Sequence, residues 1–170
     1  MIKKFLFLIL FIGGNLAGCS NESSMPSEMP DDFQFSLKYG VQALNEIDTF
    51  NHTYTKDLIM DGTITTDLEL TKDNLQAIYQ GMKEIEIVDT VKNAKYEGPF
   101  GEEVHVEPLG EYQLKLQLNG EKHNLSWTEN IYDEDTRNEL AEFVYRFLHE
   151  GIIMKKEEYK ALPQASGGYE

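Results

Sequence analysis

The sequence contains a single cysteine, Cys19, so it can form no internal disulfide and its stability must come from packing. Basic residues are also scarce, with 15 Lys and Arg against 30 Asp and Glu, and the formal net charge is −15. A charge of this size and sign repels phosphate backbones and anionic lipid headgroups. We therefore expect no nucleic-acid partner and no electrostatic attraction to a membrane.

Long apolar runs are absent after the first eighteen residues. Lys3 and Lys4 precede an apolar run at residues 5–12 that gives way to small residues, which is the order of a secretory signal. As a helix, residues 5–18 would span about 21 Å, against about 30 Å of hydrocarbon, which is too short for a stable transmembrane anchor. We expect residues 1–18 to be a signal peptide that is removed, and loss of its two lysines changes the net charge from −15 to −17.

The end of this segment, Leu16, Ala17, Gly18 and Cys19, resembles the lipobox of bacterial lipoprotein precursors. The resemblance implies cleavage between Gly18 and Cys19 and a diacylglyceryl group on the thiol of Cys19, with or without a third acyl chain (palmitate, for example) at its amino group. Two acyl chains give a durable anchor. The expected location is the extracytoplasmic face of the cell membrane. The alternative is an ordinary small-residue cleavage site at which Cys19 is incidental.

The remaining chain divides by composition. Residues 19–32 are rich in Ser, Pro, Glu and Asp, with Met25 and Met29 as the only large apolar side chains, and we expect a flexible tether that holds the domain roughly 20 Å from the membrane. Residues 33–162 are expected to form a single domain, and residues 163–170 a disordered tail.

Hydrophobic periodicity predicts an α+β domain, an antiparallel sheet with two main helices packed on one face. Alternating residues predict strands at 33–39, 47–54, with a turn at Asn51-His52, and 63–70. Leu114, Leu116 and Leu118 followed by Asn119-Gly120 predict a type I′ hairpin that continues through residues 122–127. One helix is predicted to start after Thr71, and a second to span about residues 134–150, with Asp133 or Asp135 as its cap and Gly151 as its stop. Residues 92–110 are expected to be an irregular connection with one short strand at 104–106.

The motifs at residues 33–40, 45–50 and 53–58, of the form Phe-x-Phe-x-Leu-Lys-Tyr-Gly, Asn-x-Ile-Asp-Thr-Phe and Thr-Tyr-Thr-Lys-Asp-Leu, look like those of small uncharacterised lipoproteins of Gram-positive bacteria. This resemblance implies no activity and no site.

One group of residues has metal-ligating chemistry. Glu103, His105 and Glu107 alternate, so an extended chain would place all three side chains on one side, and His123 would be a fourth ligand. The ordinary interpretation of the three is an exposed polar strand face.

Other constellations favour structural roles. The acidic run Asp133, Glu134 and Asp135 suits a helix N-terminus better than a calcium loop, which would need a glycine that is missing. Ser36 and Ser126 lie in predicted strands, outside any nucleophile motif. Trp127 is the one aromatic residue for which an exposed contact is considered, although packing is favoured.

These observations predict a non-enzymatic binding or interaction module with a protein partner at the cell envelope, held at the membrane by its lipid and requiring no cofactor. The alternative is a small metal- or substrate-binding lipoprotein that serves a transporter, with Glu103, His105 and Glu107 as ligands.

Overall fold

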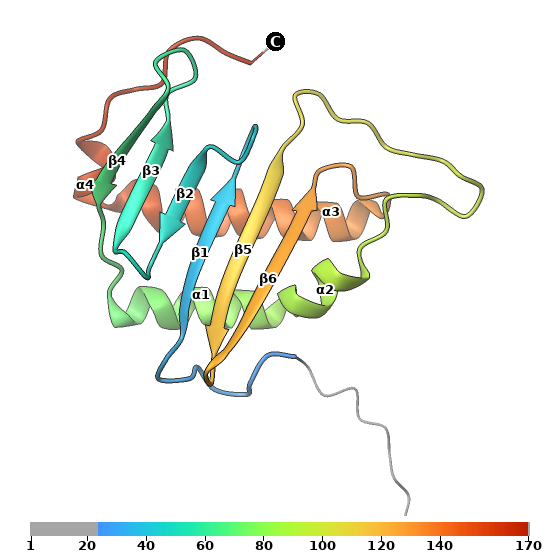
Figure 1. The fold of residues 1–170 in the computed structure, drawn as a ribbon, viewed down its shortest axis with the longest axis horizontal. Coiled ribbons are helices and arrows are strands. Elements are labelled where there is room, and N and C mark those ends of the chain that lie inside the picture. Colours follow the sequence, from blue (N-terminus) through green and yellow to red (C-terminus); the bar gives the residue numbers. More distant parts are fainter. Residues whose placement is uncertain (1–23, 170) are drawn as a thin grey trace, which may run out of the picture.

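The computed structural model describes residues 24–169, and in it six strands form one antiparallel sheet. Their order across the sheet is β4-β3-β2-β1-β5-β6, so the late hairpin β5–β6 joins the free side of β1 (Figure 1). The strands are β1 (Gln34–Tyr39), β2 (Asn45–Asp48), β3 (Thr53–Asp57), β4 (Thr63–Asp67), β5 (Glu111–Leu118) and β6 (Glu121–Thr128).

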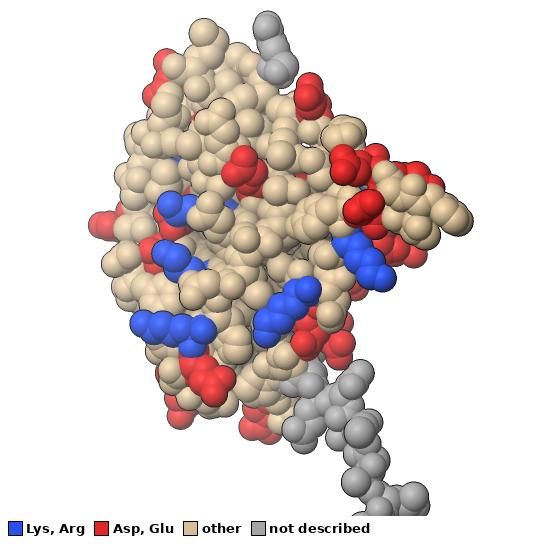
Figure 2. Space-filling view, turned by 45° about the vertical axis from the view of Figure 1, so that its right-hand side comes forward, with Lys and Arg blue, Asp and Glu red and all other residues tan. Residues whose placement is uncertain are grey.

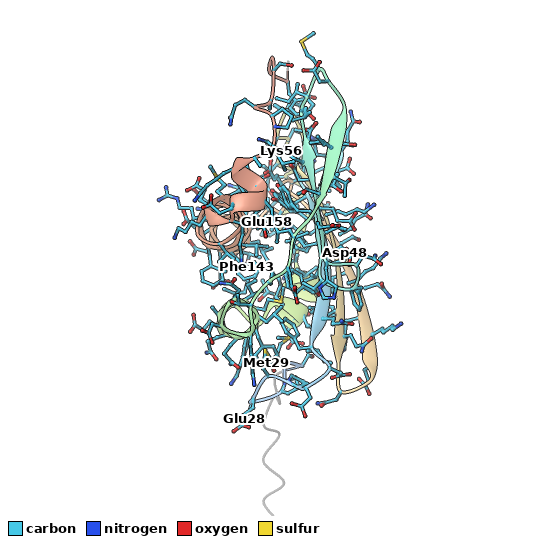
Figure 3. All side chains as sticks on the ribbon, turned by 90° about the vertical axis from the view of Figure 1, so that its left-hand side faces the viewer. Glu28, Met29, Asp48, Lys56, Phe143 and Glu158 are labelled. Carbon is cyan, nitrogen blue, oxygen red and sulfur yellow. The ribbon has the colours of Figure 1, made fainter. Side chains whose placement is uncertain are left out.

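The helices lie along one side of this sheet, as Figures 1 and 3 show. A long helix begins as α3 and continues without a break into the π-helix η1. The helices are α1 (Lys72–Glu84), α2 (Ile87–Asn93), α3 (Glu134–Ala141), η1 (Glu142–Glu150), the 3-10 turn η2 (Ile153–Lys155) and α4 (Glu157–Lys160). The predicted α+β class with an antiparallel sheet is confirmed.

Alternation along the strands separates a core side from a solvent side. Phe35, Leu37 and Tyr39 of β1 are at most 1% exposed, and every second residue of β5 is buried beside them. These side chains meet the apolar stripes of the helices in a single core. The other face of the sheet is polar, as expected when only one face of an antiparallel sheet is covered.

Several local predictions are confirmed. Asn119 and Gly120 adopt φ angles of 51° and 80° and join β5 to β6 in the expected register. The side chain of Thr71 accepts a hydrogen bond from the amide of Asn74 at 3.2 Å and begins α1. Asp133 caps α3 in the same way, accepting from the amide of Thr136 at 2.9 Å.

The connection expected at residues 92–110 differs from the prediction. Helix α2, which begins before it and runs into it, was not predicted, because its short apolar face, Ile87, Val88 and Val91, spans too few turns to show a period. Residues 104–106 form no strand, since the amide of Val106 donates to the side chain of Asn130 at 3.0 Å. Gly151 ends η1 as expected, but with φ −72° rather than in a left-handed conformation.

The prediction of a flexible tether at residues 19–32 is wrong for residues 24–32, which pack against the fold, while residues 19–23 lie outside the described residues. Met25 is 3% exposed and belongs to the core, while the backbone carbonyls of Pro26 and Ser27 accept hydrogen bonds from α1. Asp32 accepts hydrogen bonds from the amides of the hairpin turn at 119–120. Composition alone did not predict this packing, because one buried methionine and a few hydrogen bonds to backbone carbonyls hold the segment in place.

The prediction of a disordered tail at residues 163–170 is also wrong for residues 163–169, which the structure describes. Residues 163–169 lie against the β3–β4 turn, where Ser166 exchanges backbone hydrogen bonds with Leu58 and Met60. The carbonyl of Pro163 accepts from the ammonium of Lys56 at 2.8 Å, and the hydroxyl of Tyr169 donates to Asp57. The folded unit therefore extends from residue 24 to at least residue 169. Within it, no helix has both the length and the apolar character needed to cross a membrane.

Candidate functional site

The segment that leads towards Cys19 is fixed at its first described residue. The hydroxyl of Ser24 donates to Oδ1 of Asp89 at 2.7 Å, and its amide donates to Oδ2 at 3.0 Å. These hydrogen bonds lower the pKa of Asp89. Gly18 and Cys19, the predicted cleavage and lipidation residues, lie outside the described residues.

The predicted metal ligands are only partly brought together. Nε2 of His105 lies 3.5 Å from Oε2 of Glu103, and both side chains are mostly exposed, as is Glu107. In the β5–β6 ladder, His123 pairs with Leu116. It lies five residues along β6 from Thr128, the residue that pairs with the first residue of β5. That offset corresponds to about 17 Å, so His123 is remote from the connection that carries His105. Among the described residues, no three His, Cys, Asp or Glu side chains are grouped for a metal ion.

The other predicted positions have structural roles. Trp127 is 4% exposed and stacks on Tyr112 with ring centroids 4.9 Å apart, so the exposed contact is wrong and the packing interpretation is right. Ser36 is buried and donates to Glu46 at 2.7 Å, whereas Ser126 is exposed on β6. Asp133 caps α3, and the hydrogen bonds from Thr136 lower its pKa.

A groove with an apolar floor lies between α1 and η1. Its volume is about 600 Å³. The floor is formed by Ala77 and Gly81 of α1, by Ile85 at the C-cap of that helix, and by Phe143 and Phe147 from η1. Figure 3 shows Phe143 between the two helices, on the side of the sheet opposite Asp48.

The helices approach each other closely at Gly81. A Cβ atom there would lie 3.1 Å from the ring of Phe147 and 3.2 Å from that of Phe143, so the absence of a side chain lets both rings pack closely against α1. The two phenylalanine rings stack with centroids 5.7 Å apart. Phe143 is 4% exposed, but Phe147 is 37% exposed and presents a ring to the groove opening. π-Helical segments such as η1 are frequent at functional sites.

The rim of the groove is acidic. Glu84, Glu139 and Glu142 supply three carboxylates against one cation, Arg146. Nε of Arg146 lies 3.2 Å from Oε1 of Glu142, and both side chains are well exposed. The carboxylates of Glu84 and Glu139 have no cationic partner among the residues that the structure describes, so the rim has a formal excess of two negative charges.

A larger cleft, of about 680 Å³, lies between α2, residues 94–99 and the start of α3. It also is acidic, but two of its carboxylates already bind other residues of the chain. Asp89 accepts a hydrogen bond from Ser24, and Asp133 caps α3. It therefore resembles a solvated gap between elements more than a prepared ligand site.

The uncovered face of the sheet carries a shallow hollow of about 260 Å³ between Ser36, Asp48, Lys115 and Lys122. The face seen in Figure 2 carries both basic and acidic side chains, and the largest group of acidic side chains lies on the projection at the right. A polar, uncovered face is the usual state of an antiparallel sheet, and it gives no specific indication of a ligand.

A cluster of titratable groups is buried between the sheet and η1. The hydroxyl of Tyr39 lies 2.6 Å from Nδ1 of His149 and 3.0 Å from the hydroxyl of Tyr54. Burial lowers the pKa of His149 and raises those of Tyr39 and Tyr54. The ammonium of Lys56 lies 4.8 Å from the ring centre of Tyr159. The hydrogen bond between Tyr39 of β1 and His149 joins η1 to the sheet, and among the described residues no buried side-chain polar atom lacks a partner.

Comparisons with protein-family models, with curated proteins and with solved structures found no match to this chain. The function therefore has to be argued from the chain's own residues.

The sequence contained part of the signal for the groove. Ile85, Phe143 and Phe147 recur at helical spacing with other apolar residues, but such a stripe predicts burial rather than a half-exposed ring. The groove depends on the contact of Gly81 with Phe147, which are distant in sequence, and no local pattern reports that contact.

Proposed function

We propose that this protein is a lipid-anchored, extracytoplasmic binding module that acts without catalysis, and that the groove between α1 and η1 is its binding surface. The order of residues at 16–19 supports the anchor. The half-exposed ring of Phe147 above an apolar floor carries the assignment of the surface, since large apolar side chains at a concave site mark binding surfaces.

The packing of residues 24–32 gives this anchor a short reach. Only residues 20–23 separate Cys19 from Ser24, and an extended chain spans at most about 3.5 Å per residue, so Ser24 lies within about 18 Å of Cys19. The same segment is bound to Tyr79 and Lys83 of α1, the helix that forms one wall of the groove. The proposed surface is therefore held near the membrane rather than on a long tether.

The chemistry of the groove favours binding over catalysis. Its floor consists of aliphatic and aromatic carbon, and its carboxylates stand at an open rim, where no base, nucleophile and orienting group meet. Three titratable groups with shifted pKa values, Tyr39, Tyr54 and His149, lie instead in the buried cluster, where they bind one another.

We also infer that two helical segments, α1 and the continuous α3–η1, are the main supports of the sheet. Ile78, Tyr79 and Met82 of α1 are at most 1% exposed, and Leu140, Val144 and Leu148 of the second segment are equally buried. The shorter α4 contributes no buried residue. Substitution of Ile78 or Val144 by Ala should therefore lower stability far more than substitution by Ala of an exposed α4 residue such as Glu158.

Growth of producing cells with labelled palmitate tests the anchor. The wild-type protein should incorporate label and sediment with envelopes, whereas Cys19→Ser should do neither. An unlabelled wild-type protein, or a Cys19→Ser protein that still sediments with envelopes, would overturn the proposal.

A further inference from the structure

We propose that the groove between α1 and η1 binds a cationic amphipathic helix of a partner protein. The inference rests on the proposed function only in taking this groove as the binding surface, and it does not depend on lipidation of Cys19. It names the partner by the two features that the groove would recognise, an apolar stripe and flanking basic side chains.

The shape of the floor fits a helix. Ala77 and Gly81 of α1 and Ile85 at its C-cap follow one another at intervals of four residues, so they form a single row along that helix. The row is about 12 Å long at 1.5 Å per residue. That length accepts roughly two turns of a partner helix, whose apolar side chains at i, i+3, i+4 and i+7 would be the anchors.

The contacts at the centre of the floor fit the apolar stripe of such a helix. Gly81 lets the rings of Phe143 and Phe147 pack closely against α1, and the ring of Phe147 remains partly exposed there. A large aromatic side chain that becomes fully desolvated on binding is the usual centre of an interface. We therefore expect Phe147 to be the main apolar contact.

The rim selects the charge of the partner. Glu84 of α1 and Glu139 of α3 lie on opposite walls, without cationic partners among the described residues, while Arg146 is engaged by Glu142. Basic side chains that flank an apolar stripe would meet a carboxylate on each wall. The acidity of the whole chain adds long-range attraction for a basic partner. Fatty acids and anionic lipids carry negative charge, as the rim does, so the rim would repel them.

The test uses residues 20–170, which retain every residue that the structure describes. The probe is a synthetic peptide of about 18 residues, longer than the length below which isolated helices are marginal, with a leucine stripe and lysine elsewhere. A second peptide has the same leucine stripe with glutamate in place of lysine. Binding is followed by fluorescence anisotropy of labelled peptide, and folding of each variant by circular dichroism.

We expect the lysine peptide to bind and the glutamate peptide to bind at least about tenfold more weakly. Phe147→Ser and the double variant Glu84→Lys/Glu139→Lys should each weaken binding of the lysine peptide by about tenfold or more. The matched controls are Phe100→Ser, at a ring that is 90% exposed, and Glu158→Lys, at an exposed carboxylate of α4, and both should bind like wild type.

Three results would overturn the inference. They are equal affinity for the two peptides, wild-type affinity in both groove variants, and displacement of the lysine peptide by laurate at equal concentration, which would assign the floor to acyl chains. Since residues 20–170 lack Cys19, failure here is separate from failure of the palmitate experiment.

Discussion

The hydroxyl of Tyr79 donates a 2.6 Å hydrogen bond to the carbonyl oxygen of Pro26. This contact joins the first helix to a segment whose composition suggests a disordered tether. The ammonium of Lys83, one turn further along α1, binds the carbonyl of Ser27 at the same distance. The chain is therefore held against α1 at residues 26 and 27, before it leads towards Cys19.

The first prediction concerns Met25, which anchors this segment. Met25→Ala should lower the free energy of unfolding by about 2 to 3 kcal/mol, because it removes a side chain that is 3% exposed from the core. Met60→Ala, at a methionine that is 77% exposed, is the matched control and should change stability by less than about 0.5 kcal/mol. Chemical denaturation measures both. Equal effects of the two substitutions would show that residues 24–32 are not packed as described.

The second prediction concerns the pH dependence of stability. Burial lowers the pKa of His149 below its ordinary value of 6.5; Lys56 adds to the shift and Glu150 opposes it. The unfolded chain therefore takes up the proton first, and this contribution to stability is lost as the pH falls from 6.5 through the lowered folded pKa. His149→Gln should remove that part of the pH dependence.

Denaturation midpoints at a series of pH values between 7.5 and 4.5, chosen to span this window, provide the measurement. The lowered pKa values of Asp32, Asp89 and Asp133 act only when the pH approaches or falls below their ordinary value of 3.8, so they do not obscure it. Identical pH profiles for wild type and His149→Gln would contradict the burial of His149 against Tyr39.

The third prediction concerns Gly151, at the end of η1. A Cβ atom there would lie 2.2 Å from the carbonyl oxygen of Phe147, so Gly151→Ala forces the last turn of the helix to shift. We expect a loss of about 1 to 3 kcal/mol in the free energy of unfolding. Gly168→Ala, where an added Cβ meets nothing within 4 Å, should be nearly neutral. A neutral Gly151→Ala would mean that the helix does not end in this geometry.

Local sequence patterns predicted those parts of the fold that local physics determines. Alternation at 33–39 gave β1, Asn119-Gly120 gave the hairpin turn, and Thr71 and Asp133 gave the helix starts, because turn and cap chemistry acts within a few residues. What could not be predicted are contacts between distant segments. Met25 in the core, Tyr169 on Asp57 and Gly81 against Phe147 each need the assembled fold.

The contrast between local patterns and contacts of distant segments also explains why the sequence suggested a metal site and did not reveal the groove. The spacing of Glu103, His105 and Glu107 suggested ligands only if residues 103–107 were a strand, and the amide of Val106 instead binds the side chain of Asn130. The groove had no such motif, because its floor is made of ordinary helix residues from two segments. Its recognition required the exposure of Phe147 and the close approach at Gly81.

The fourth prediction separates the proposed function from metal delivery to a transporter. Two exposed side chains, Glu103 and His105, form too few ligands for tight binding, since stable sites use about four. Elemental analysis of the purified protein should give well below one equivalent of divalent metal, unchanged in His105→Ala. One tightly held equivalent that His105→Ala removes would support the transporter alternative instead.

Lipidation of Cys19 is tested most directly by the mass of the amino-terminal tryptic peptide from protein extracted from envelopes. The peptide should comprise residues 19–38, since Lys38 is the first basic residue after Cys19, and should carry a diacylglyceryl group on the thiol. Detection of residues 1–18 still joined to the chain, or of residues 19–38 with an unmodified thiol, would contradict a lipid-anchored protein.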